Sequence, residues 1–286
     1  MPVTPERVFE PCTLQPVGGF RVDRPGQPPR RVMTRAHWHD VLEVNYVRQG
    51  RGHYLIDGRS YDLSPGTVFV IPAGVAHRTR PLPTNPHWNL TVYFRPEGLA
   101  PLGDRAVAFG TAVAGRVRRI PAGRFADLWE NVFSGLEREG RHGDPAGSLA
   151  ACAKVLDACL LVSRCAEAAK GEPGIDLSPA ARYVQGMMEH VRQHLDAPLT
   201  LRAIAAAVGL HPNYACSVFR EQTGTPLFAY VAQQRATRAR TLLATSTLPV
   251  AEVARRCGFR SIPSFYRVIR TAYGTTPAGL RDLLLS

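Results

Sequence analysis

The sequence predicts a two-domain α+β protein, with an N-terminal antiparallel β-barrel or jelly roll, flanking helices, and an all-helical C-terminal domain. Three observations carry this prediction. Short strand-like runs separated by tight turns fill much of the first third of the chain. Helical spacing of apolar residues dominates the last third. A short segment rich in Gly and Pro lies between the two patterns.

Length and composition favour a soluble, cytoplasmic protein with two hydrophobic cores. The chain has 286 residues, of which 45% are hydrophobic, and a chain of this length often divides into two domains. No run approaches the roughly 18 apolar residues of a membrane span, and the N-terminus lacks the apolar core of a signal peptide. The six cysteines show no paired spacing, which favours reduced structural thiols. They are Cys12, Cys152, Cys159, Cys165, Cys216 and Cys257.

Positive charge is concentrated in the C-terminal part of the chain. The whole sequence has a formal net charge of +12. Residues 178–286 hold 13 Arg, no Lys and 5 acidic residues, which gives +8, and the remaining 22 basic and 18 acidic residues give +4. Such an excess is expected of a surface that binds DNA phosphates, although a charged face is more often simply solvated.

The N-terminal domain is expected over residues 35–170, after an arm at residues 1–34 with one short strand near residues 19–22. Four strand-like runs, VLEVNYVRQG, GHYLIDGRSYDL, GTVFVIPAG and WNLTVYF, alternate with glycine-containing turns between residues 37 and 94. No helical pattern separates these runs. Short strands joined by tight turns predict the antiparallel barrel or jelly roll.

Two amphipathic helices are expected after the strands. The apolar stripe of the first helix is Phe125, Leu128, Trp129, Val132, Phe133 and Leu136. The near-heptad stripe of the second helix is Leu149, Cys152, Leu156, Cys159 and Ser163. Because its other face is also apolar, at Val155, Leu160 and Leu161, the second helix either covers the barrel or packs against its own copy in a homodimer. Residues 171–177 form the expected linker.

The C-terminal domain is expected over residues 178–286. Its first helix has a buried stripe of Val184, Met187, Met188, Val191 and Leu195. The segment from Pro249 to Pro277 predicts two short helices joined at Gly258, the second of them capped by Ser261. Their stripes, each at i, i+3, i+4 and i+7, are Val250, Val253, Ala254 and Cys257, then Phe265, Val268, Ile269 and Ala272. This arrangement predicts a helix-turn-helix.

The helix-turn-helix pattern occurs twice. Val208-Gly209-Leu210 matches Cys257-Gly258-Phe259 at a shift of 49 residues, and Ala215 and Phe219 match Phe265 and Ile269 at a shift of 50. A helix of about five turns is expected between the two copies and holds them apart. Its stripe is Phe228, Val231, Ala232, Arg235, Ala239, Leu242 and Leu243, with Arg235 in a structural role.

This tandem arrangement resembles the DNA-binding domain of AraC/XylS-type transcription regulators over about the last 105 residues. The connecting segment RxxRAxxLL, from Arg235 to Leu243, and the terminal GTTPAGLR support the resemblance. It implies a sequence-specific transcription regulator, expected to be an activator, with double-stranded DNA, RNA polymerase and a small-molecule effector as partners. Ala215, Ser217 and Ile269 depart from the residues usual in that family, so the first copy is expected to make fewer base contacts.

Candidate DNA-binding residues lie on the second helix of each copy. Arg267 is the strongest candidate, because a guanidinium can bind guanine O6 and N7 with two hydrogen bonds, and Asn213 can bind adenine in the same way. A solvated surface or a phosphate contact is the alternative at each position. The candidates are Asn213, Cys216, Ser217, Arg220, Arg260, Ser261, Ile262, Ser264, Tyr266, Arg267 and Arg270.

The N-terminal domain resembles the cupin fold at its two motifs. His37, His39, Glu43 and Gly50 fit the spacing of the first motif, and Gly66, Pro72, Gly74 and His77 fit the second, without its usual closing Asn. In a strand of period two, His37, His39, Glu43 and Asn45 point to one face. These residues and His77 are therefore the candidate effector-binding site.

Three interpretations of this polar set remain open. Three histidines and one carboxylate, His37, His39, His77 and Glu43, are the ligand set with which cupins bind Zn, Ni, Mn or Fe. The same side chains could instead hydrogen-bond a sugar or another small effector without a metal, or form a structural polar cluster. A second function class also follows, a metal-dependent cupin enzyme with an appended helical domain. The tandem DNA-reading unit favours the regulator, because an enzyme has no use for two groove-reading helices.

Overall fold

The computed structural model describes residues 8–9, 20–23, 36–82, 84, 88–114, 118–139, 145–169 and 177–285. The chain divides into two compact units, Met1–Ala181 and Arg182–Ser286. The first unit carries sheets and helices and the second is helical, which confirms the predicted two-domain α+β class. The expected arm and linker lie largely outside the described residues, apart from two short strands of the arm and Leu177 at the end of the linker.

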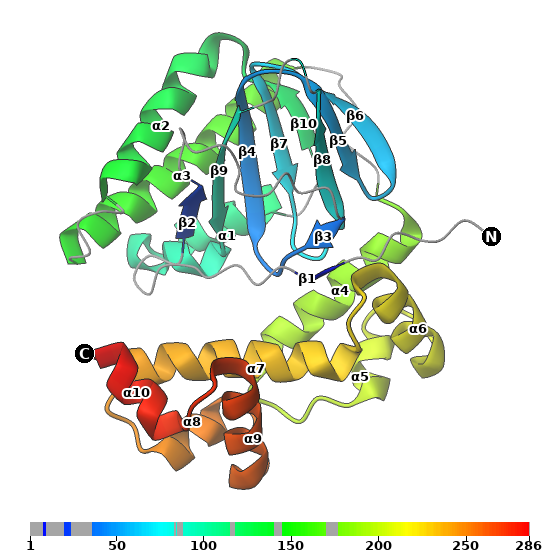
Figure 1. Ribbon diagram of the computed structural model, residues 1–286, viewed down its shortest axis with the longest axis vertical. Coiled ribbons are helices and arrows are strands. Elements are labelled where there is room, and N and C mark those ends of the chain that lie inside the picture. Colours follow the sequence, from blue (N-terminus) through cyan, green and yellow to red (C-terminus); the bar gives the residue numbers. More distant parts are fainter. Residues whose placement is uncertain are drawn as a thin grey trace. The chain divides into compact units, whose positions relative to one another are not determined.

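The strands of the first unit form two five-stranded sheets (Figure 1). One has the order β10-β7-β4-β9-β2 and the other the order β1-β3-β8-β5-β6. All pairs are antiparallel except β1 with β3. The strand bounds are β1 Val8–Phe9, β2 Phe20–Asp23, β3 His37–Trp38, β4 Leu42–Gln49, β5 Gly52–Ile56, β6 Arg59–Leu63, β7 Thr67–Ile71, β8 His77–Pro81, β9 Trp88–Phe94 and β10 Arg118–Pro121.

The predicted barrel is not closed. Each sheet ends in edge strands with a single neighbour, and within the described residues no strand pairs one sheet with the other. A closed barrel needs an unbroken ladder of strand pairs around its axis. The alternation of side chains along a strand specifies which face each residue takes but not whether two edges meet, so the sequence pattern could indicate the strands but could not decide whether the barrel closes.

Strand β4 contributes side chains to two hydrophobic clusters of the first unit, one on each of its faces. Leu42, Val44 and Tyr46 belong to a core cluster that includes side chains of the flanking helices. Val47 belongs to a second cluster with Tyr54, Ile56 and Phe69, which lies between the sheets. Because side chains alternate along a strand, Glu43 and Asn45 share the face of Val47 and lie between the sheets. Both side chains are buried.

Helices cover the outer face of the β4 sheet. They are the 3-10 helices η1 Pro96–Leu102 and η2 Gly123–Phe125 and the α-helices α1 Asp104–Ala114, α2 Ala126–Glu139 and α3 Pro145–Ala168. Trp129 of α2 stacks on Tyr46 of β4, with ring centroids 6.1 Å apart. Figure 1 shows α2 and α3 side by side on this face. None of the described helices combines the length and apolar character that a membrane crossing needs.

The second unit contains two helix-turn-helix pairs, α5–α6 and α8–α9, joined by the long helix α7 (Figure 1). Its helices are α4 Pro179–Gln193, which begins in the first unit, α5 Leu201–Ala206, α6 Pro212–Thr223, α7 Leu227–Thr245, α8 Val250–Arg256, α9 Ile262–Tyr273 and α10 Pro277–Leu285. The 19 residues of α7 correspond to about 29 Å of helix. The predicted stripe of α4 is buried throughout.

Some predicted core positions are wrong. Phe228 is 47% exposed, because α7 begins at Leu227 and turns Leu227, Tyr230 and Val231 inward instead. Ala272 in the last turn of α9 is also exposed. In α2, Leu128 is 43% exposed, whereas its neighbour Trp129 is fully buried. Each wrong position lies beside the true stripe, where a helical period of 3.6 residues leaves the edge of the apolar face undetermined.

The described cysteines are all free thiols. Four of them, Cys152, Cys159, Cys165 and Cys257, are buried, and Cys216 is partly exposed. Burial raises the pKa of Cys159 to about 12 and that of Cys257 to about 11. The sixth cysteine, Cys12, lies outside the described residues.

Candidate functional site

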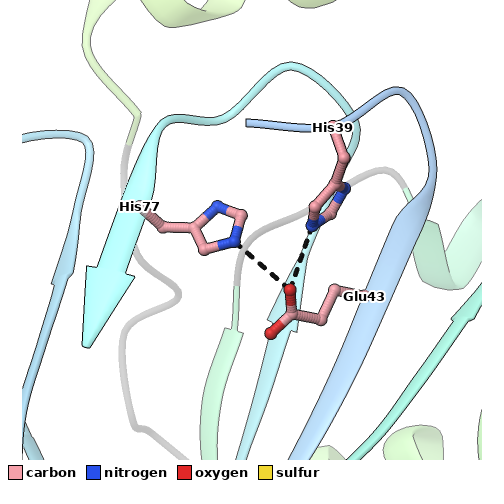
Figure 2. A group of neighbouring side chains, drawn as sticks. All are labelled: His39, Glu43 and His77. Atoms are coloured by element: carbon pink, nitrogen blue, oxygen red, sulfur yellow. Dashed lines mark hydrogen bonds and ion pairs between the residues drawn. The ribbon is translucent and has the colours of Figure 1, made fainter. Parts of the chain in front are cut away.

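A carboxylate and two imidazoles meet between the two sheets of the first unit. Glu43 lies on β4, His39 directly follows β3 in the turn that leads to β4, and His77 begins β8. Nε2 of His39 lies 3.0 Å and Nε2 of His77 lies 3.2 Å from the same oxygen, Oε2 of Glu43 (Figure 2). Each of these residues is 2% exposed. We call them the His39-Glu43-His77 centre.

The other oxygen of Glu43 is also occupied. Its Oε1 accepts a hydrogen bond from the hydroxyl of Tyr54 at 2.7 Å and another from Nδ2 of Asn45 at 3.2 Å. The same amide nitrogen of Asn45 donates to Oγ1 of Thr91 at 3.1 Å. The carboxylate is thus held in one orientation by groups from three strands.

The environment of the centre changes two pKa values strongly. Burial raises the pKa of Glu43, but the charge of His77 and the hydrogen bonds to His39 and His77 outweigh burial, and the net pKa lies well below the usual carboxyl range. Burial and the neighbouring Glu43 hold the pKa of Tyr54 well above that of a free tyrosine. The carboxyl group is therefore an anion and the phenol is a neutral donor at neutral pH.

Both imidazoles are fixed by backbone carbonyl groups on their other side. Nδ1 of His39 lies 2.9 Å from the carbonyl oxygen of Val41, and Nδ1 of His77 lies 2.8 Å from that of Val75. A carbonyl only accepts, so each Nδ1 carries the hydrogen. In a neutral ring Nε2 then presents a lone pair to the carboxylate. A cation between the rings and Glu43, or a hydrogen on Nε2, would make this approach favourable.

The donor set fits a divalent transition metal. The ligand atoms of His39, Glu43 and His77 lie within 4.8 Å of one another, and tetrahedral ligands about 2.1 Å from a metal are about 3.4 Å apart. Fixing of Nδ1 by a carbonyl is a common way for proteins to orient histidine ligands. Of the predicted four-residue set, His37 stays outside this group, although its ring centroid lies 4.3 Å from that of His77.

Sequence reasoning missed Tyr54, Thr91 and Tyr93 at this site. The ring of Tyr93 lies edge-on to His39, with centroids 5.3 Å apart. Tyr54 could have been found, because Gly52, Tyr54 and Ile56 alternate as the buried face of β5. Thr91 gave no comparable signal, since its position depends on the pairing of β9 with β4.

The second helices of the two helix-turn-helix pairs, α6 and α9, are built alike. Nδ1 of His211 caps α6 by accepting from the backbone of Asn213, and Oγ of Ser261 caps α9 by accepting from the backbone of Ser264, both at 3.4 Å. Each helix ends at a glycine with a left-handed backbone, Gly224 with φ 69° and Gly274 with φ 72°. The two helices thus start and stop at equivalent residues.

The exposed face of these helices carries most of the predicted DNA-binding residues. The exposed ones are Asn213, Ser217, Arg220, Arg260, Ser261, Ile262, Arg267 and Arg270. Cys216, Ser264 and Tyr266 are only partly exposed, and Tyr266 packs against the core cluster of α7, α8 and α9. Sequence reasoning missed Tyr214 on α6, which is 54% exposed. The sequence could have indicated Tyr214, because it falls outside the helical spacing of Ala215, Val218 and Phe219, which form the buried face of α6.

Family models match both parts of the chain. Residues 26–150 match the AraC-like ligand binding domain, and residues 177–282 match a helix-turn-helix domain. The chain belongs to the AraC/XylS family of transcription regulators. Its second unit is the DNA-binding domain and its first unit is the ligand-binding domain of such a regulator.

This AraC/XylS regulator is similar to proteins named for sugar operons. It is 26% identical over 242 residues to the arabinose operon regulatory protein of Escherichia coli (strain K12), which covers 83% of this chain and 79% of that protein. It is 22% identical over 261 residues to the melibiose operon regulatory protein of the same strain, covering 88% and 85%. The solved DNA-binding domain of AdpA with a target DNA is 31% identical, covers 37% of this chain and 92% of that chain, and has a TM-score of 0.34.

Family membership decides between the two predicted function classes. The relatives of this AraC/XylS regulator are transcription regulators and not enzymes. The alternative of a metal-dependent cupin enzyme with an appended helical domain therefore finds no support. The polar centre between the sheets belongs to a ligand-binding domain.

Proposed function

We propose that the chain regulates transcription in response to a small polyhydroxylated effector, such as a sugar, that binds at the His39-Glu43-His77 centre. The observation that carries the proposal is a buried carboxylate with imidazole, phenol and amide groups around it, inside an otherwise apolar interior. Buried polar groups of this kind fix ligand orientation in small-molecule sites. The relatives named for arabinose, xylose and melibiose operons support a sugar as the effector.

Calorimetric titration of the purified chain with arabinose, xylose and melibiose tests the effector. His39→Ala and His77→Ala should weaken binding at least tenfold and leave DNA binding without effector unchanged, because each removes a buried polar contact. His53→Ala is the matched control, since His53 lies on β5 with its side chain 46% exposed. Unchanged effector affinity in both buried variants would place the effector elsewhere.

A bound divalent metal is the second candidate for the same centre. The two Nδ1 atoms are held by carbonyl groups while both Nε2 atoms approach Oε2 of Glu43, so three ligand atoms converge as they would around a metal ion. The residues that would hold Zn, Ni, Mn or Fe are His39, Glu43 and His77. A metal would supply a cationic site for the oxygen atoms of an effector.

Elemental analysis of protein purified without chelator separates the two candidates. A resident metal predicts close to one ion per chain in the wild type and in His53→Ala, and loss of the ion in His39→Ala and His77→Ala. A metal-free protein whose histidine variants lose effector binding supports direct effector binding. A metal-free protein whose variants respond normally would contradict both candidates and leave a structural cluster.

We further propose a homodimer formed through α3. Leu149 and Leu160 are 48% and 37% exposed, and with Ala153 and Leu156 they follow the spacing i, i+4, i+7, i+11 of a coiled-coil seam. Of the other residues of the predicted stripe, Cys152 and Cys159 are buried and Ser163 is partly buried, so the proposed seam is shifted from the predicted one.

The regulator is proposed to act on RNA polymerase in the cytoplasm, as an activator. This proposal is supported by the family's role in transcription and by the DNA-reading helices. In vitro transcription from a promoter that carries the selected binding site tests it. An effector-dependent rise in transcript supports activation, and a fall would identify a repressor.

A further inference from the structure

The two helix-turn-helix pairs differ by one inserted residue. The backbone N–H of Leu210 donates to Ala205 at 3.0 Å, and that of Phe259 donates to Ala254 at the same distance, so the two turns begin alike. His211 then caps α6 directly, whereas Arg260 stands between Phe259 and the capping residue Ser261. The extra residue of the second pair is therefore an exposed arginine.

Equivalent positions on α6 and α9, 50 residues apart, carry different exposed side chains. Ser217 of α6 corresponds to Arg267 of α9, and both are exposed. Tyr214, 54% exposed, corresponds to the smaller, partly exposed Ser264. The hydroxyl of Ser217 also donates to the carbonyl of Asn213 at 3.2 Å, so its hydrogen is used within the helix.

The arginines of the two helix-turn-helix pairs also differ. Arg220 and Arg270 are equivalent and occupy the last turn of each helix, so they do not distinguish the two. Arg260 and Arg267 are present only in the second pair. Neither forms an ion pair with any described residue, whereas Arg255 and Arg256 of α8 both pair with Glu252. The second helix of the second pair and the turn before it therefore carry two guanidinium groups, those of Arg260 and Arg267, that have no counterpart at the equivalent positions of the first pair.

We infer that each half of the operator contains two unlike boxes, an A·T-rich box read by α6 and a G·C-rich box read by α9. On α6, the amide of Asn213 matches the donor and acceptor pattern of adenine, and the ring of Tyr214 packs on the methyl group of thymine. On α9, Arg267 and Arg260 match the two acceptors of guanine. This inference rests on the proposed DNA-binding role of the two helices.

Selection of binding sites from a random duplex library by the full-length chain tests the inference. The expected result is two conserved boxes about one helical turn apart, one A·T-rich and one G·C-rich. Two G·C-rich boxes, or two boxes of like sequence, would overturn the inference while specific DNA binding stood. Absence of any sequence preference would instead contradict the proposed function itself.

Reciprocal variants assign each box to its helix. Arg267→Ser should reduce the preference for guanine over other bases in the G·C box by roughly 5- to 150-fold. The preference in the A·T box should stay unchanged. Ser217→Arg should add a preference for guanine in the A·T box. Arg270→Ala is the charge control and should weaken all sequences equally. A loss of preference in the A·T box on Arg267→Ser would overturn the assignment.

Replacement of thymine by uracil tests the role of Tyr214 without a change in base pairing. Uracil lacks only the methyl group, whose burial is worth about a fourfold change in affinity. Wild-type protein should bind uracil-containing A·T boxes about fourfold more weakly, and Tyr214→Ala should bind both forms equally. Equal binding of both forms by the wild type would overturn the contact between Tyr214 and the thymine methyl group. Replacement of thymine by uracil in the G·C box should have no effect and serves as the control.

Discussion

The guanidinium of Arg235 donates a hydrogen bond from Nη2 to the carbonyl oxygen of Ala197 at 2.9 Å. Its Nε donates to the carbonyl of Leu195 at 3.2 Å, and its charge lies over the ring of Phe259, 5.8 Å from the centroid. Arg235 thus connects α7 with the chain after α4 and with the turn of the second helix-turn-helix pair. The structural role expected for this arginine accords with these contacts.

Arg235→Ala should destabilise the DNA-binding domain by about 2 to 4 kcal/mol, because hydrogen bonds to a charged donor contribute about 1.5 to 3 kcal/mol each and are not fully additive. Denaturant unfolding followed by circular dichroism measures the change. Arg238→Ala is the matched control on the same helix, since Arg238 forms only an exposed ion pair with Asp196 and should cost less than about 1 kcal/mol. Equal costs for both variants would refute the connecting role.

Gly258→Ala should be far more damaging than Gly274→Ala, although both glycines have a left-handed backbone, with φ 77° and 72°. A Cβ at Gly258 would lie 2.2 Å from the carbonyl oxygen of Leu195, whereas a Cβ at Gly274 meets nothing within 4 Å. The left-handed conformation alone costs roughly 1 to 2 kcal/mol. We expect about that loss at Gly274 and at least about 3 kcal/mol at Gly258 in unfolding experiments.

A single protomer should protect a half-site of roughly 17 to 20 base pairs, because two reading helices entering successive major grooves are about 34 Å apart. Hydroxyl-radical footprinting measures this length. Arg267→Ala should cost about 1 to 3 kcal/mol at one or two base pairs, and Arg192→Ala, which removes an exposed charge on α4, is the control. Protection of a single short site would contradict the two-headed interpretation, and a uniform loss would reduce Arg267 to a phosphate contact.

Leu160→Arg should give a monomer with both domains folded, because Leu160 is exposed on α3 and lies on the proposed dimer seam. A monomer has no linked second DNA-binding domain, so the second half-site is no longer bound at high effective concentration. Binding to an operator with two half-sites should then weaken by about 100-fold or more. Light scattering and affinity measurements check both points. Leu156→Arg tests the same seam but should also destabilise the first unit, since Leu156 is partly buried and packs against its hydrophobic core.

Ala112→Arg supplies the control for the seam. It adds the same charge at an exposed position of α1 and should leave the dimer intact. A Leu160→Arg protein that remains dimeric would move the interface elsewhere.

Cys216 should be the most reactive of the described cysteines, because it is partly exposed on α6 and the others are buried. Maleimide labelling at pH 8 with mass spectrometry should find it modified, and operator DNA should slow the reaction. Cys216→Ser provides the control. Rapid labelling of Cys257 in the native protein would contradict this prediction.

The buried thiols should also make stability depend on pH. Burial raises the pKa of Cys257 to about 11 in the folded chain, from about 9 for an exposed thiol. Between these values the unfolded chain loses a proton that the folded chain keeps, so the free energy of unfolding should fall as pH rises from about 9 to about 11. Cys257→Ala should flatten this part of the curve in thermal unfolding experiments.

Periodicity along the chain was sufficient to predict the DNA-binding domain. The stripes of α4, α8 and α9, the two glycine turns and the long connector all follow from residues within one or two helical turns of each other. Helix formation and the burial of one face are local, so a local pattern specifies them. The prediction failed at Phe228 and Ala272, where the edge of a stripe depends on which neighbour the helix meets.

The centre between the sheets needed tertiary structure. Strand alternation assigned Glu43 and Asn45 to one face, but it could not show that Tyr54 of β5 and Thr91 of β9 complete the hydrogen bonds. Nor could it separate His37 from the ring pair that faces Glu43. These contacts depend on strand order and register across 11 to 46 residues of sequence, and long-range pairing is set by how whole sheets pack together, not by the spacing of residues along one strand.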